Sequence, residues 1–103
     1  MFLTISKENF NALVIKSTKP VLIDFYADWC GPCQMQLPIV ESLASEVGDL
    51  AVVGKVNIDL ERELTNQFKI TSVPTMVVFQ NGKIKNHVTG VHSKTALRQL
   101  LGV

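Results

Sequence analysis

This 103-residue chain lacks the features that mark a membrane, nucleic-acid-binding or secreted protein. No apolar run reaches the roughly 18 residues that a membrane-spanning helix needs. Ten basic residues stand against nine acidic ones and neither sign forms a run, so the clustered basic charge that binds nucleic acid is missing. The first residues show no basic segment followed by an apolar core, which is the pattern of a secretory signal. We therefore expect a cytoplasmic monomer that binds neither nucleic acid nor membrane.

Cysteine is also scarce, with only two in the chain, and the length predicts a single domain over residues 1–103. A chain of this size buries roughly 60–65% of its unfolded surface, so a core can form without cross-links. Both cysteines lie in Trp29-Cys30-Gly31-Pro32-Cys33, between an apolar, β-branched segment and a segment with helical spacing. A strand that leads through Cys-x-x-Cys into a helix favours redox chemistry over half of a zinc site.

The hydrophobic pattern predicts an α/β fold in the order β-α-β-α-β-α-β-β-α. The first strands need parallel pairing with crossover helices, whereas Asn81-Gly82 predicts an antiparallel hairpin, so the central sheet is mixed and flanked by helices. Ser6 is expected to cap the first helix, and Pro38 to bend the second. The expected strands are 2–5, 21–26, 51–58, 76–80 and 83–89, and the expected helices are 7–17, 32–47, 60–68 and 93–101.

Two thiols at this spacing can exchange with a disulfide, because one thiolate attacks and the second releases the mixed intermediate. The start of the helix favours negative charge on Cys30, which predicts an exposed nucleophile there. Cys33, one turn into the helix, is expected to be more buried and to resolve the intermediate. The alternatives are a structural disulfide, which constrains so short a loop rather little, and a zinc site, for which two further ligands are missing.

Two charged residues lie in otherwise apolar predicted strands. Asp24 is expected to be poorly solvated in such a strand, which predicts a raised pKa and a carboxyl group that can hold a proton near neutral pH and accept one from Cys33. Lys55 lowers the pKa of Asp24 if the two strands are neighbours. A structural aspartate and a lysine that extends to solvent are the alternative interpretations.

The chain resembles the thioredoxin family over essentially its whole length. The matching residues are Trp29-Cys30-Gly31-Pro32-Cys33, Asp24, Pro38, Lys55, Val73-Pro74-Thr75, Asn81-Gly82 and Gly90. The resemblance implies the thioredoxin fold, and a cis peptide bond before Pro74, where sequence alone favours trans. It also implies that no cofactor is bound and that a flavin-containing thioredoxin reductase supplies electrons from NADPH.

A flat, uncharged docking surface is expected around the cysteines, and it would accept many disulfide-containing protein substrates. Trp29 is the only tryptophan and is expected to be partly exposed there, although a core position is the alternative. Gly90 indicates close backbone approach or a positive φ. The expected surface consists of Trp29, Gly31, Pro32, Ile58, Val73, Pro74, Gly90 and Val91.

These observations predict a thiol-disulfide oxidoreductase that works as a protein-disulfide reductase. An oxidase or isomerase of the same fold is disfavoured, because Gly31-Pro32 places no positive charge beside the Cys30 thiolate. A different class is a redox-independent binding module or holdase that uses the same apolar surface. Loss of function on mutating both cysteines to serine would separate the reductase from the binding module.

Overall fold

The computed structural model describes residues 1–103 and contains one five-stranded mixed sheet. The strands lie in the order β1-β3-β2-β4-β5, with β1, β3 and β2 parallel and with β4 antiparallel to both β2 and β5. This arrangement confirms the expected mixed α/β sheet. The strands are β1 (Phe2–Thr4), β2 (Val21–Tyr26), β3 (Val52–Asn57), β4 (Thr75–Gln80) and β5 (Lys83–Thr89).

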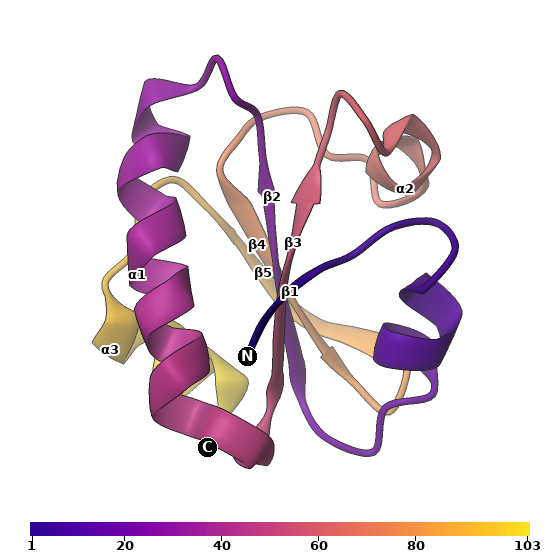
Figure 1. Cartoon of the computed structure of the whole chain (residues 1–103), viewed down its shortest axis with the longest axis vertical. Helices are drawn as coiled ribbons and strands as arrows, with labels where there is room; N and C mark the ends of the chain where they lie inside the picture. Colours follow the sequence, from indigo (N-terminus) through magenta and orange to yellow (C-terminus); the bar gives the residue numbers. More distant parts are fainter.

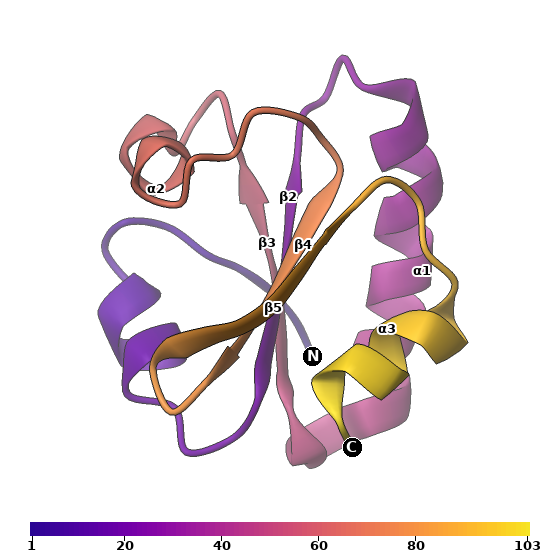
Figure 2. The same ribbon diagram turned by 180° about the vertical axis from the view of Figure 1, so that it is seen from behind.

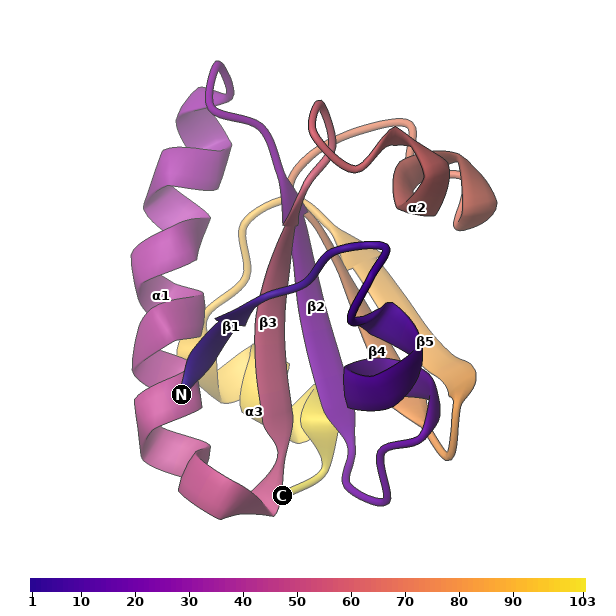
Figure 3. The same cartoon turned by 45° about the vertical axis from the view of Figure 1, so that its right-hand side comes forward.

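Helices cover both faces of the sheet (Figure 1). The long helix α1 (Gly31–Val47) and the C-terminal helix α3 (Lys94–Leu101) lie on one face, as the view from behind shows (Figure 2). The short helix η1 (Asn11–Ile15) and α2 (Arg62–Gln67) lie on the other, opposite α1 in Figure 3. A single turn, η2 (Gly48–Leu50), follows α1. None of these helices combines the length and the apolar stretch needed to cross a membrane.

The two faces of the sheet have separate cores, because successive side chains of a strand point to opposite sides. Leu22 of β2 packs with α1 and α3, whereas Ile23 of the same strand packs with η1 and α2. Both faces of β2 are therefore covered, which is why its sequence is apolar throughout except at Asp24. Asp24 lies two residues after Leu22 and therefore faces α1.

The first helix is shorter than expected and starts differently. Helix η1 covers only Asn11–Ile15, and the hydroxyl of Ser6 does not cap it. Instead the Ser6 N–H donates to the side-chain oxygen of Asn9 at 2.8 Å, and the Asn9 amide donates to the carbonyl of Thr4 at 3.0 Å. The Asn9 side chain thus satisfies the Ser6 N–H as in a helix-capping contact, and the Phe10 N–H donates to the Ser6 carbonyl at 3.0 Å, so the chain begins to turn at Ser6 although the regular helix starts later.

Local side-chain and backbone preferences explain the start of α3 and the turn between β4 and β5. The Ser93 hydroxyl caps α3, because it accepts the Ala96 N–H at 3.1 Å. Asn81 and Gly82 have φ of 53° and 78°, as a two-residue hairpin of this kind requires, and join β4 to β5. Pro38 lies inside α1.

The carboxyl ends of β2 and β3 meet at one edge of the sheet, because the two strands are parallel. Strand β2 leads from Tyr26 into the start of α1, and β3 leads from Asn57 toward α2. The segment before β4 reaches the same edge, since Thr75 pairs with Phe25. Three segments that are distant in the sequence therefore meet where the cysteines lie.

Candidate redox site

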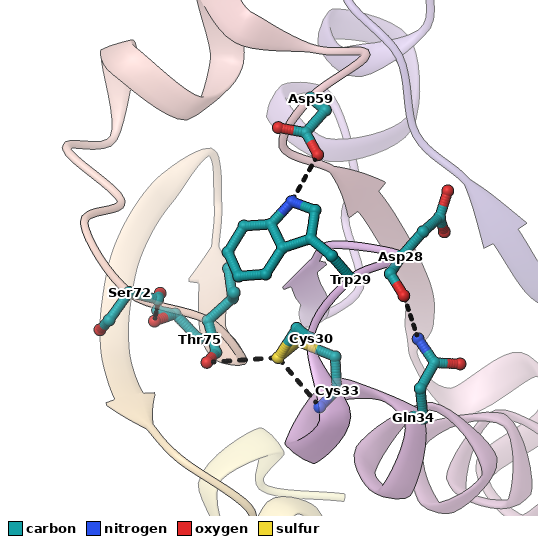
Figure 4. Close-up of a disulfide and its surroundings, with 9 residues drawn as sticks. Asp28, Trp29, Cys30, Cys33, Gln34, Asp59, Ser72 and Thr75 are labelled. Carbon is teal, nitrogen blue, oxygen red and sulfur yellow. Dashed lines mark hydrogen bonds between the residues drawn. A yellow bond between two sulfur atoms is a disulfide. The ribbon is translucent and has the colours of Figure 1, made fainter.

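Cys30 and Cys33 form a disulfide across the first turn of α1 (Figure 4), with their Cα atoms 5.2 Å apart. Cys30 is the N-cap residue of the helix, and Gly31 and Pro32 occupy the first helical positions. Proline is tolerated there because the first helical N–H groups have no partner within the helix. The Cys33 N–H donates to the sulfur of Cys30 at 3.2 Å. The helix start thus directs a backbone N–H at the Cys30 sulfur, at the end of the helix whose dipole favours negative charge.

The two cysteines differ less in solvent exposure than the sequence predicts. Cys30 is only 6 % exposed and Cys33 is fully buried, so the expectation of an exposed Cys30 is wrong as stated. Ile58 and Val73 pack against the pair and cover it. The sulfur of Cys30 lies 3.6 Å from the carbonyl oxygen of Val73. The order of accessibility is nevertheless the expected one, with Cys30 on the solvent side.

Asp24 is fully buried in β2, and neither of its carboxylate oxygens has a hydrogen-bond partner in the protein. Burial removes the hydration of the charged form and raises the pKa of Asp24 to about 7. The Lys55 ammonium opposes this shift and lowers the pKa of Asp24. Asp24 therefore exchanges a proton close to neutral pH, beneath the helix that carries both cysteines.

Lys55 lies directly beside Asp24, because the two residues are register partners in neighbouring parallel strands. Its ammonium nitrogen lies 5.3 Å from the centre of the Phe2 ring and 5.7 Å from the centre of the Tyr26 ring. Two aromatic faces at these distances attract a cation. Lys55 is half-buried between the rings, on the same side of the sheet as Asp24.

The segment Val73–Pro74 approaches the disulfide from the start of β4. The peptide bond between these residues is cis. Pro74 is buried beneath the site, so it does not contribute the exposed surface that the sequence predicts for it. Its carbonyl accepts the N–H of Gly90 at 2.9 Å, which joins the end of β5 to this segment. Gly90 has a φ of +88°, and a side chain there would have open space, so positive φ rather than close approach explains the glycine.

Trp29 is 70 % exposed beside the disulfide, which excludes the core position considered for it. Its indole N–H donates to a carboxylate oxygen of Asp59 at 2.9 Å (Figure 4). Asp59 is not among the site residues predicted from the sequence. The sequence does contain a signal for this contact. Asp59 follows β3 and Trp29 follows β2, and because neighbouring parallel strands end at the same edge of a sheet, the two residues are expected to lie close together.

The structure brings most of the expected surface residues to one end of the molecule. Gly31, Pro32, Trp29 and Val91 are exposed, whereas Ile58, Val73 and Gly90 are half-buried between them. Two apolar side chains that the sequence analysis did not assign to this surface, Met35 and Leu60, are also exposed. Gln36, a fully buried polar residue of α1, is likewise absent from the predicted site residues. No three His, Cys, Asp or Glu side chains lie together as metal ligands.

A disulfide between closely spaced cysteines at a helix start, below an apolar surface and on a helix that covers a buried carboxyl group, defines a redox-active dithiol protein. Comparison with known proteins agrees. The family model Thioredoxin matches residues 1–102. A thioredoxin of Chlamydia caviae is 43 % identical over 101 residues, which cover 98 % of this chain and 96 % of the relative. A thioredoxin of Acidithiobacillus ferridurans is 42 % identical over 99 residues, which cover 96 % of this chain and 92 % of the relative.

The chain belongs to the thioredoxin family. It is a thiol-disulfide oxidoreductase of the disulfide-reductase type, and the redox-independent binding module is not favoured. A further relative is the bifunctional thioredoxin reductase/thioredoxin of Mycobacterium leprae, 41 % identical over 93 residues. Those residues cover 90 % of this chain but only 20 % of that longer protein.

Proposed function

We propose that Cys30 is the nucleophile and Cys33 the resolving thiol of a general protein-disulfide reductase. The observation that carries this assignment is the position of Cys30 at the N-cap of α1, where the Cys33 N–H points at its sulfur. The same contact stabilises a Cys30 thiolate in the reduced protein. Cys33, one turn further and fully buried, is left to act second.

The reaction transfers two electrons to the substrate. The Cys30 thiolate attacks one sulfur of a substrate disulfide, and the other substrate sulfur leaves as a thiolate. Cys33 then loses its proton and attacks the Cys30 sulfur of the mixed disulfide, which releases the second substrate thiolate. The products are a substrate dithiol and the Cys30–Cys33 disulfide.

Asp24 is proposed to take the proton that Cys33 loses. A general base works best when its pKa lies near the working pH, and burial raises the pKa of Asp24 to about 7. The side chain faces α1, the helix whose buried side carries Cys33. Lys55 tunes this base, since its charge lowers the pKa of Asp24.

Protein substrates are proposed to dock on the apolar surface around Cys30. Trp29, Pro32 and Val91 supply exposed apolar area. The backbone of Val73 lies beside Cys30, with its carbonyl oxygen 3.6 Å from the sulfur, and suits an extended substrate segment that adds to the backbone. A surface that relies on apolar area and backbone contacts can accept many partners.

The oxidised protein must regain two electrons, and we propose a flavin-containing thioredoxin reductase that uses NADPH as the donor. The Mycobacterium leprae relative, named as a bifunctional thioredoxin reductase/thioredoxin, supports a reductase partner for this family. We further propose that the chain works as a monomeric single domain in the cytoplasm, with disulfide-containing proteins as its substrates.

Trapping the mixed disulfide tests the assignment of the two cysteines. Cys33→Ser, reduced and mixed with insulin, is expected to accumulate a covalent complex, because the intermediate forms but is not resolved. Cys30→Ser should form little complex under the same conditions. Mass spectrometry of non-reduced samples measures both. If Cys30→Ser trapped insulin and Cys33→Ser did not, the roles would be reversed.

A further inference from the structure

Gln36 is a polar residue in the most buried row of α1. It lies three residues after Cys33 on the same face of the helix, in a row that continues with Val40 and Leu43, and it is fully buried. A buried amide without hydrogen-bond partners is unfavourable, since it has lost its contacts with water. The reason for a glutamine here must therefore lie in what its side chain binds.

The side chain of Gln36 pairs with the peptide groups of His92, 56 positions away in the sequence. The Gln36 amide nitrogen donates to the His92 carbonyl at 3.1 Å. The His92 N–H donates to the Gln36 side-chain oxygen at 2.7 Å. One amide thus satisfies both backbone groups of one residue, in the way that a neighbouring strand would.

His92 belongs to the short segment that connects β5 to α3; one further hydrogen bond anchors this segment, and another lies within it. The Gly90 N–H donates to the Pro74 carbonyl at 2.9 Å. The ring nitrogen Nδ1 of His92 lies 2.8 Å from the Gly90 carbonyl oxygen. A carbonyl only accepts hydrogen bonds, so this contact is a hydrogen bond when Nδ1 carries the hydrogen.

Val91 stands between these two anchored residues, and 41 % of it is exposed beside the active site. Its own N–H and carbonyl make no hydrogen bond within the protein. The position of Val91 relative to Cys30 and Cys33 therefore depends on the bonds that Gly90 and His92 make. The bonds from Gln36 are the ones that attach the segment directly to the helix of the two cysteines.

We propose that Gln36 is a positioning residue that holds Val91 in place for docking of protein substrates. The proposal rests on the proposed function, in which Val91 is part of the docking surface. Gln36 contributes nothing to the exchange of sulfur bonds, and its effect is confined to substrates large enough to contact the 90–92 segment. An apolar side chain of equal size would fill the same space in the core without fixing His92.

The test uses the variant Gln36→Met. Methionine keeps the length of the side chain but removes both hydrogen bonds to His92. The pre-reduced protein is mixed with increasing insulin, and the half-saturating concentration and limiting rate are measured in single turnovers. The rate with the small disulfide 5,5′-dithiobis(2-nitrobenzoate) measures the disulfide exchange itself, because this compound is too small to dock on the 90–92 segment. The matched control is Gln99→Met, the same exchange at an exposed position of α3.

The variant is expected to raise the half-saturating insulin concentration about 3- to 10-fold, because the docking-competent position of the segment becomes a minority state. The limiting rate and the rate with the small disulfide should stay within about twofold of the parent, and Gln99→Met should match the parent throughout. An unchanged half-saturating concentration overturns the proposal. An equal loss of rate with both substrates also overturns it, because a general structural role would act in that way.

Hydrogen exchange in the parent protein provides a test that does not depend on a variant folding. The His92 amide is expected to exchange at least about tenfold more slowly than the Val91 amide, which has no partner. Equal exchange at the two positions would overturn the proposal. If the parent protein reduces neither insulin nor the small disulfide, the proposed function itself fails, which is a separate outcome.

Discussion

Asp24→Asn should change how the stability of the protein depends on pH. The parent carboxyl group has a pKa of about 7 in the folded chain, raised by burial, against an ordinary value of 3.8. Below about pH 4 the carboxyl group is protonated in both the folded and the unfolded chain. Between that pH and about 7 only the folded chain keeps the proton, so rising pH favours unfolding. Above pH 7 the carboxyl group is ionised in both states, so the free energy of unfolding falls no further on its account.

The size of the effect follows from the two pKa values. The difference between 3.8 and about 7, at 1.36 kcal/mol per pH unit, corresponds to a loss of about 4 kcal/mol from pH 4 to pH 8. Asparagine cannot ionise and so resembles the protonated carboxyl group at every pH. The variant should therefore match the parent at pH 4 and exceed its stability by up to about 4 kcal/mol at pH 8.

Urea unfolding of the oxidised proteins, measured at each pH from 4 to 9, gives the free energy of unfolding by linear extrapolation. Asp49→Asn is the control, because it removes a carboxyl group from an exposed position of η2 and should follow the parent curve. Parallel curves for the parent and Asp24→Asn between pH 4 and pH 8 would refute the argument, because Asp24 would then ionise equally in both states.

Three further substitutions, one of them with its own control, test neighbouring parts of the site. Lys55→Met should raise the pKa of Asp24 above about 7, since it removes the charge that lowers it, and carboxyl chemical shifts measured against pH report the change. Asp59→Ala should lower the fluorescence anisotropy of Trp29, which loses its 2.9 Å hydrogen bond, while stability falls by no more than about 1 kcal/mol. Gly90→Ala should cost about 1–2 kcal/mol in thermal unfolding, because alanine resists a φ of +88° although space is available. Gly31→Ala, which has equal space and no positive φ, should cost almost nothing.

Local patterns in the sequence were sufficient for most of the fold. The bounds of β2 coincide with the apolar run Val21–Tyr26. A strand covered on both faces is apolar throughout and does not alternate between apolar and polar residues. Asn81-Gly82 predicts its hairpin because both positions need positive φ. Helix η1 was predicted too long because the apolar spacing of Phe10, Leu13 and Val14 does not distinguish the capping turn at Ser6–Asn9 from the regular helix that follows it.

The site was less predictable where it depends on contacts between distant residues. The low exposure of Cys30 comes from Ile58 and Val73, which reach it from two other segments of the chain. The pairing of Gln36 with His92 cannot be read from spacing, but a glutamine in a buried helical row was a visible signal. Buried polar residues in apolar patterns are thus the positions to question first, as Asp24 illustrates.

An equilibrium redox titration of the Cys30–Cys33 pair tests the central claim most directly, with Trp29 fluorescence as the signal. A disulfide reductase requires a reversible two-electron transition at a strongly reducing potential. We expect a midpoint of about −270 mV, the value characteristic of thioredoxin. A midpoint near about −120 mV would instead indicate an oxidase, and the absence of a reversible transition would contradict redox function altogether.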